Sequence, residues 1–169
     1  MPILSRRQLA AAAGSGLVAR TASAAGPAML DLKAIGKEAD SACLYHCDFG
    51  DLRRFSQMLD NARNHLEAYD FDPLALKIVI VAHAAGIRFF LADPGGTPWA
   101  NDPMEPDIAK RMAALGGYGV QGLLCATTFA RNGLSHDRAR PEPWLRMVKS
   151  GVATVSALQG KGFAYVKIG

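Results

Sequence analysis

Cysteine, long apolar runs and acidic residues near the N-terminus are scarce or missing in this chain of 169 residues. Its 3 cysteines leave at least one thiol unpaired within a monomer, and the length allows one domain whose core needs no disulfide staples. No apolar run approaches the roughly 20 residues that span a bilayer, so we expect no membrane span. The composition, 50% hydrophobic and 20% charged, excludes disorder, collagen and coiled coil.

The positive charge is concentrated at the N-terminus. The net charge is +4, yet the first 24 residues hold three arginines and no acid. Without these arginines, basic residues exceed the 15 acidic residues by only one. The basic balance therefore gives little reason to expect a polyanionic partner, and we predict that the protein does not bind nucleic acid.

The N-terminal segment has the order of regions found in an export signal. Arg6 and Arg7 precede a modestly apolar run at residues 9–19, and Arg20 and a small-x-small pattern at 22–24 follow. This order is typical of a cleaved signal, and the adjacent arginines favour the twin-arginine route.

The alternative for this segment is an alanine-rich first helix of the fold. Its apolar residues show no helical stripe, which favours the signal. We therefore expect residues 1–24 to be a twin-arginine signal peptide and residues 25–169 to be a single periplasmic domain.

Strand and helix patterns alternate through the rest of the chain. Residues 76–82 (LKIVIVA) form a nearly continuous apolar run, as expected for a strand buried on both faces. Residues 93–106 hold four prolines and predict a loop. The expected strands are 42–47, 76–82, 120–124, 145–148 and 163–168, and the expected helices are 51–69, 107–115, 125–133 and 152–159, with a short helical or irregular piece at 86–91.

This alternation predicts an α/β fold with a mostly parallel sheet of about five strands. Ligands of such folds bind at the carboxyl ends of the strands. Four side chains with useful chemistry fall at that edge: His46, Cys47, His83 and Cys125.

Several stretches of the sequence resemble the DsrE/DsrF-like family of sulfur-relay proteins. They are residues 59–66 (LDNARNHL), 80–86 (IVAHAAG), 119–128 (GVQGLLCATT), 150–153 (SGVA), 158–159 (LQ) and 162–165 (GFAY). The resemblance implies a flavodoxin-like fold with helices on both faces of the sheet, frequent oligomers and no organic cofactor. In active members a cysteine after a central strand carries sulfur as a persulfide, and Cys125 occupies the matching position.

Cys125 is the favoured nucleophile, with a buried structural cysteine as the alternative reading. A helix N-terminus lowers the pKa of a thiol by placing partial positive charge and free N–H groups beside it. Arg131, His136, Arg138 and Arg140 follow in sequence and could attract anions such as thiosulfate or polysulfide.

The other two cysteines have different expected roles. Cys43 and Cys47 are four residues apart on one strand, or about 13 Å, whereas a disulfide needs Cα atoms within about 7 Å. Cys43 is expected in the core. Cys47 shares an edge with Cys125, so it is either a resolving or disulfide-forming thiol or incidental.

The histidines at this edge admit three roles. We favour His83 as a proton donor or anion partner near Cys125, with a hydrogen-bonded structural role as the alternative. A metal site formed by His46, Cys47, His83 and Cys125 is less favoured, because the spacing matches no compact zinc motif. Adjacent His46 and Cys47 would also point to opposite faces of a regular strand.

Two asparagines, Asn61 and Asn64, lie three residues apart and share one face of the first expected helix. They could orient the site or tie the helix to nearby loops. The G-x-G-x-x-G pattern at 117–122 follows a helix and enters a strand, which is the reverse of the dinucleotide-binding arrangement.

Three functional hypotheses follow. The first is a periplasmic, homo-oligomeric sulfur carrier that passes sulfane sulfur from a donor protein or a small sulfur anion, through Cys125, to a partner thiol. Whether it also turns over alone, as a sulfurtransferase, stays open. The second is a non-catalytic oligomeric module that binds a small anion or a redox partner, and the third is a Cys/His metal-binding protein.

Overall fold

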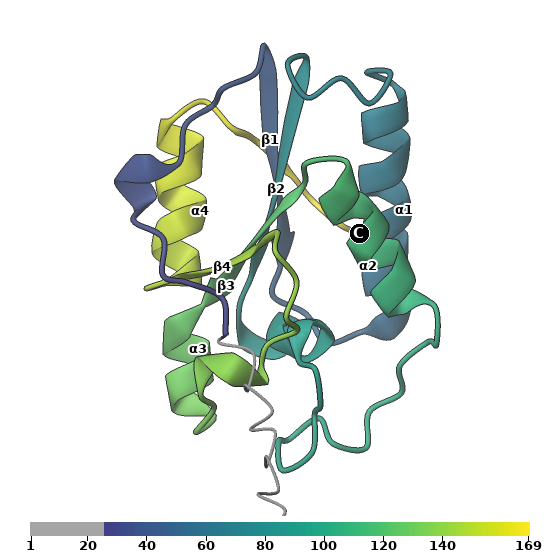
Figure 1. The fold of residues 1–169 in the computed structure, drawn as a ribbon, viewed down its shortest axis with the longest axis vertical. Coiled ribbons are helices and arrows are strands. Elements are labelled where there is room, and N and C mark those ends of the chain that lie inside the picture. Colours follow the sequence, from purple (N-terminus) through teal and green to yellow (C-terminus); the bar gives the residue numbers. More distant parts are fainter. Residues whose placement is uncertain (1–25) are drawn as a thin grey trace, which may run out of the picture.

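Five parallel strands form one sheet in the order β4-β3-β2-β1-β5 (Figure 1). The computed structural model describes residues 26–169, so the predicted signal peptide at 1–24 lies outside the described residues. The strands are β1 (Ser41–Cys47), β2 (Leu76–Ala82), β3 (Gln121–Cys125), β4 (Leu145–Val148) and β5 (Ala164–Val166). The predicted parallel α/β fold is confirmed.

Helices cover both faces of this sheet. The α-helices are α1 (Leu52–Glu67), α2 (Ile108–Gly117), α3 (Ala126–Arg131) and α4 (Gly151–Gly160), and three short 3-10 helices are η1 (Leu32–Ala34), η2 (Ala84–Phe90) and η3 (His136–Arg138). Figure 1 shows α1 and α2 on one face and α4 on the other, with α3 at the edge where β3 ends. None of the described helices is long and apolar enough to cross a bilayer.

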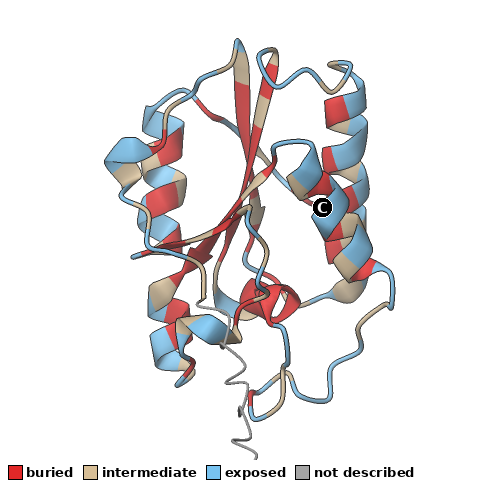
Figure 2. Ribbon diagram, viewed as in Figure 1, coloured by how far each residue is buried: buried red, intermediate tan, exposed pale blue. Residues whose placement is uncertain are grey.

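The sheet separates two apolar cores, and strand alternation assigns side chains to them. In β2, Ile78 and Ile80 belong to the larger core under α1 and α2, whereas Val79 and Val81 belong to the smaller core under α4. All four side chains are at most 1% exposed, as the continuous apolar run predicts. Buried residues accordingly run along the strands in Figure 2.

Apolar residues at spacings of three and four form the buried face of helix α1, but the helix ends earlier than its sequence pattern predicts. The Asp51 side chain caps the helix by accepting a hydrogen bond from the Arg54 amide at 2.7 Å. Its buried face includes Phe55, Leu59 and Leu66. The predicted helix ran to Tyr69, but the backbone turns left-handed soon after Glu67, with φ values of 54° at Asp70 and 57° at Phe71.

Arg88 attaches the proline-rich loop to the rest of the fold. Its guanidinium is 3% exposed and donates to the carbonyl oxygens of Gly50 and Pro103, each at 2.5 Å. Its Nε lies 3.3 Å from the Asp102 carboxylate. Residues 93–106 contain no helix or strand, as predicted, and Arg88 supplies the polar contacts that hold this loop beside η2.

Candidate functional site

Cys125 lies where β3 meets α3. The strand was predicted to end at residue 124, and β3 extends one residue further, through Cys125. It is both the last residue of β3 and the N-cap of α3. Its side chain is 5% exposed. Alternation places it on the same face as Leu123, which belongs to the core under α4. Its register partner on β4 is Val148, so the start of α4 comes close to the sulfur.

Hydrogen bonds favour the thiolate form of Cys125. Burial alone acts to raise the pKa of this thiol, but hydrogen bonds from the Thr128 side chain and from the backbone amides of Gly151, Thr128 and Thr127 outweigh it. The net effect is a pKa below the ordinary value for cysteine. Polar groups at the starts of α3 and α4 therefore favour the thiolate form of Cys125.

The Thr128 hydroxyl is oriented by a second contact. The Ala84 amide donates to Thr128 Oγ1 at 3.1 Å, which leaves the hydroxyl hydrogen free to point at Cys125. Ala84 has a φ of 48°, a left-handed conformation that costs an alanine roughly 1 kcal/mol. Local strain after β2 thus helps to position the donor.

A pair of histidines lies at the same edge of the sheet. His46 Nε2 and His83 Nε2 are 2.6 Å apart, and His46 Nδ1 lies 2.9 Å from the Tyr165 hydroxyl. Burial, followed by the charge of His46, lowers the pKa of His83, although Asp48 opposes the shift. His83 is therefore neutral near physiological pH.

His83 and Cys125 are linked through Gly151. A Cβ at Gly151 would lie 2.7 Å from the Cβ of His83, so the histidine packs directly on this glycine. The amide of the same Gly151 helps to lower the pKa of the Cys125 thiol. His83 and Cys125 thus share Gly151 as a neighbour, but no hydrogen bond between the two is found among the described residues. The role of His83 as a proton donor stays a prediction.

Cys47 belongs to the opposite face of the sheet. It is fully buried in the core under α1 and α2, and the Gly86 backbone packs against it. Burial raises the pKa of its thiol well above the ordinary range. The three cysteines are all free thiols. The structure therefore does not bring Cys47 and Cys125 into one cleft, and the Cys2His2 grouping is not assembled.

The predicted basic residues divide into two groups. Arg138 donates to the carbonyls of Asp93 and Gly95, and Arg140 donates to the carbonyl of Phe89. Arg138 therefore holds the segment after η2, and Arg140 holds the end of η2 itself. Arg131 is exposed in the last turn of α3, which leaves it accessible to an anion. Anion binding by these arginines stays a prediction.

The asparagines lie on α1, away from the Cys125 face. The Asn61 carbonyl accepts a hydrogen bond from the Tyr45 hydroxyl at 3.4 Å, and Asn64 is exposed with its carbonyl accepting from the Ala68 amide. Tyr45 belongs to the core under α1. The Tyr45 contact ties the helix to β1, whereas the bond to Asn64 lies at the end of the helix itself, and neither connects it to the thiol.

The model of the DsrE/DsrF-like family matches residues 19–168. The chain belongs to this family. Among solved structures it is similar to a protein of unknown function, MTH1491, from Methanobacterium thermoautotrophicum. The two share 23% sequence identity and a TM-score of 0.60, and the match covers 75% of this chain and 98% of the other. That likeness supports the fold. No curated protein matches the chain.

Thr128 and Gly151 are site residues of this DsrE/DsrF-like protein that the sequence analysis missed. Thr128 stands three residues after Cys125, the spacing at which helix N-terminal groups meet the cap residue, so its position was open to prediction. Gly151 follows the neighbouring strand β4, and only the strand register brings it to Cys125.

We expect Cys125 of this DsrE/DsrF-like protein to react with iodoacetamide at a lower pH than an ordinary thiol. Thr128→Val should shift the rate profile to higher pH, because the variant loses the side-chain donor while burial still opposes the thiolate. The rates would be measured by mass spectrometry of the Cys125 peptide across a pH series.

The matched control for this measurement is Thr127→Val. The hydroxyl and the amide of Thr127 both donate to the Lys149 carbonyl, so its side chain does not serve the thiolate. This variant should keep the wild-type profile. An unchanged profile in Thr128→Val would show that the hydroxyl does not stabilise the thiolate.

Proposed function

We propose that this protein is a sulfur carrier that holds sulfane sulfur as a persulfide on Cys125. Membership in the DsrE/DsrF-like family supports a sulfur-relay role at the family level. The observation that carries the finer proposal is the position of Cys125 at the N-terminus of α3, where the Thr128 hydroxyl and nearby backbone amides hold the pKa of its thiol below the ordinary value. A structural cysteine in a core needs no such donors, whereas a nucleophilic thiolate does.

The proposed transfer conserves atoms and electrons. The Cys125 thiolate attacks the outer sulfur of a donor persulfide, one S–S bond forms on Cys125, and the donor's S–S bond breaks. The donor leaves as a thiolate, and the sulfane sulfur stays at the same oxidation level. An acceptor thiolate then attacks the outer sulfur of the Cys125 persulfide, which releases the Cys125 thiolate for another cycle.

The polar groups that lower the pKa of Cys125 act on both steps. They stabilise negative charge on the Cys125 sulfur before attack and again when the outer sulfur departs. The side chain is only 5% exposed, which favours a slender donor such as a polysulfide chain or the tip of a persulfide over a bulky disulfide. Exposed Arg131 and Lys149 lie on segments that adjoin the site and supply positive charge for an anionic donor.

We further propose that the carrier works in the periplasm as a homo-oligomer. The Arg6-Arg7 pair followed by an apolar run supports export by the twin-arginine route. This route carries folded proteins, which is compatible with assembly before export. Its donors and acceptors would then be periplasmic proteins or small sulfur anions, in contrast to the cytoplasmic partners of the family's relay members.

The test is sulfur loading of the reduced, folded protein. After exposure to polysulfide and removal of the excess, intact mass and peptide mapping should place an added sulfur atom on Cys125, and a reductant should remove it. Cys43 and Cys47 provide an internal control, because burial raises both of their pKa values, that of Cys43 to about 12. Sulfur on none of the three cysteines, or on all three alike, would contradict the proposal.

A further inference from the structure

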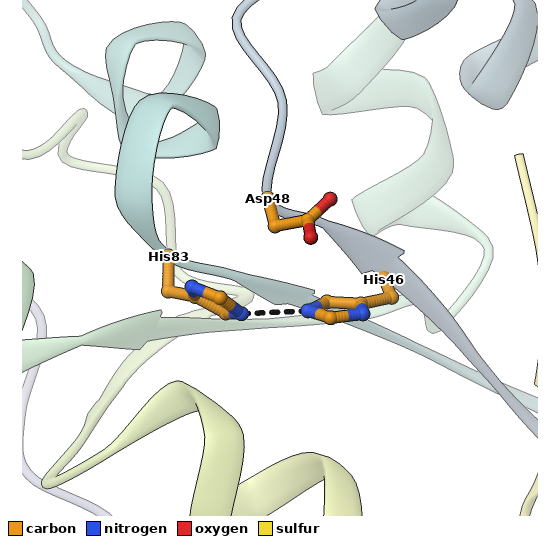
Figure 3. Close-up of side chains that lie close together, drawn as sticks. All are labelled: His46, Asp48 and His83. Carbon is orange, nitrogen blue, oxygen red and sulfur yellow. Dashed lines mark hydrogen bonds between the residues drawn. The ribbon is translucent and has the colours of Figure 1, made fainter.

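His46, Asp48 and His83 gather at the carboxyl ends of β1 and β2 (Figure 3). One ligand-type atom from each residue lies within 4.8 Å of the other two. We propose that these three side chains form a binding site for one divalent transition-metal ion of the zinc class. The proposal stands whether or not Cys125 carries sulfur.

The strand register explains why the three residues meet. His46 pairs with Val81, and His83 comes two residues after Val81, so both histidines point to the same face of adjacent strands. Asp48 comes two residues after His46, just beyond the end of β1, and its carboxylate lies close to both imidazole rings (Figure 3). The His83 amide also donates to the Cys47 carbonyl at 3.1 Å, which keeps the two strand ends together.

The donor set selects the class of ion. Two imidazole nitrogens and one carboxylate suit zinc, cobalt or ferrous ions, whereas magnesium and calcium prefer oxygen ligands alone. Three protein ligands leave a coordination position open, as in catalytic zinc sites. Cys125 is absent from the cluster, so the site differs from the Cys2His2 grouping considered from the sequence.

Small movements convert the present arrangement into a coordination site. Two nitrogens bound tetrahedrally at about 2.05 Å from zinc lie about 3.3 Å apart. The two Nε2 atoms are 2.6 Å apart, so the rings must separate by about 0.7 Å. The Asp48 carboxylate must move inward, and it is exposed and free to do so.

Tyr165 supplies the support that metal-bound histidines generally have. At 2.6 Å, one Nε2 must carry a hydrogen and donate to the other, because two facing lone pairs would repel. A metal ion takes the place of that shared hydrogen. The hydrogen of His46 then resides on Nδ1 and donates to the Tyr165 oxygen, 2.9 Å away.

The experiment is a titration of the reduced full-length protein with Co²⁺, followed by competition with Zn²⁺. We expect one ion per chain and weak visible bands without the strong near-ultraviolet absorption of a cobalt–thiolate bond. His83→Ala and Asp48→Asn should each weaken binding by at least about tenfold, and Tyr165→Phe by about ten- to a hundredfold. Circular dichroism would confirm that each variant is folded.

His136→Ala is the matched control, because His136 lies on η3 and contacts the Phe129 ring. It should bind like the wild type. Asp48 and Tyr165 are exposed, so their variants still test the proposal if the histidine variant misfolds. Absence of saturable binding, a thiolate band, or wild-type affinity in both Asp48→Asn and Tyr165→Phe would overturn the proposal.

Discussion

Cys125→Ser is expected to abolish sulfur loading by polysulfide completely while leaving the fold intact. Serine is close in size to cysteine and is a favoured residue at the N-cap position that Cys125 occupies. It cannot form a thiolate, so no persulfide can form at this position. Intact mass after polysulfide treatment measures the loss, and thermal unfolding checks the fold.

Two further variants make this result specific. Cys43→Ala and Cys47→Ala should each load like the wild type, because both thiols lie in the core on the other face of the sheet. Loading that persists in Cys125→Ser would move the carrier role to another thiol. Loading lost in a folded Cys47→Ala protein would restore the predicted resolving role of Cys47.

Gly86→Ala is expected to destabilise the protein by about 3 kcal/mol or more. A Cβ at this position would collide with the backbone carbonyl of Cys47 and lie 2.8 Å from its sulfur. Backbone atoms cannot move aside by changing rotamer, so η2 would have to shift away from the end of β1. For a domain of this size, the melting temperature should fall by roughly 10 °C.

Gly117→Ala is the matched control for this stability measurement. Gly117 is exposed at the end of α2, and a Cβ there would meet no atom within 4 Å. Alanine also has the higher helix propensity, so this variant should be as stable as the wild type or slightly more stable. Equal melting temperatures for Gly86→Ala and the wild type would contradict the packing described here.

Much of the fold was open to prediction because its signals are local. The apolar run at 76–82 appears as β2 with the predicted bounds, since continuous β-branched residues suit a strand buried on both faces. Boundaries were less predictable. The third strand includes Cys125, and helix α1 stops before Tyr69 because the following backbone turns left-handed.

The site was only partly predictable because its contacts cross between strands. The position of Cys125 at a strand end followed from its neighbours in the sequence. The approach of the Gly151 amide to Cys125 and the pairing of His46 with His83 depend on strand register. Register relates residues that are far apart in the sequence, so it cannot be predicted from neighbouring residues alone. Cys47 and Cys125 do not share a cleft, because their side chains lie on opposite faces of the sheet: Cys47 is in the core under α1 and α2, whereas Cys125 is on the same face as Leu123.

The sequence by itself determined the α/β class and the strand-end positions of Cys47, Cys125, His46 and His83, because each depends on residues that are adjacent or regularly spaced. Only the tertiary structure decided which of these side chains meet. Parallel register brings Gly151 near Cys125 and sets Asp48 beside the two histidines. The physical reason is that a polar cluster forms where strand ends converge, and that convergence is set by packing across the whole sheet.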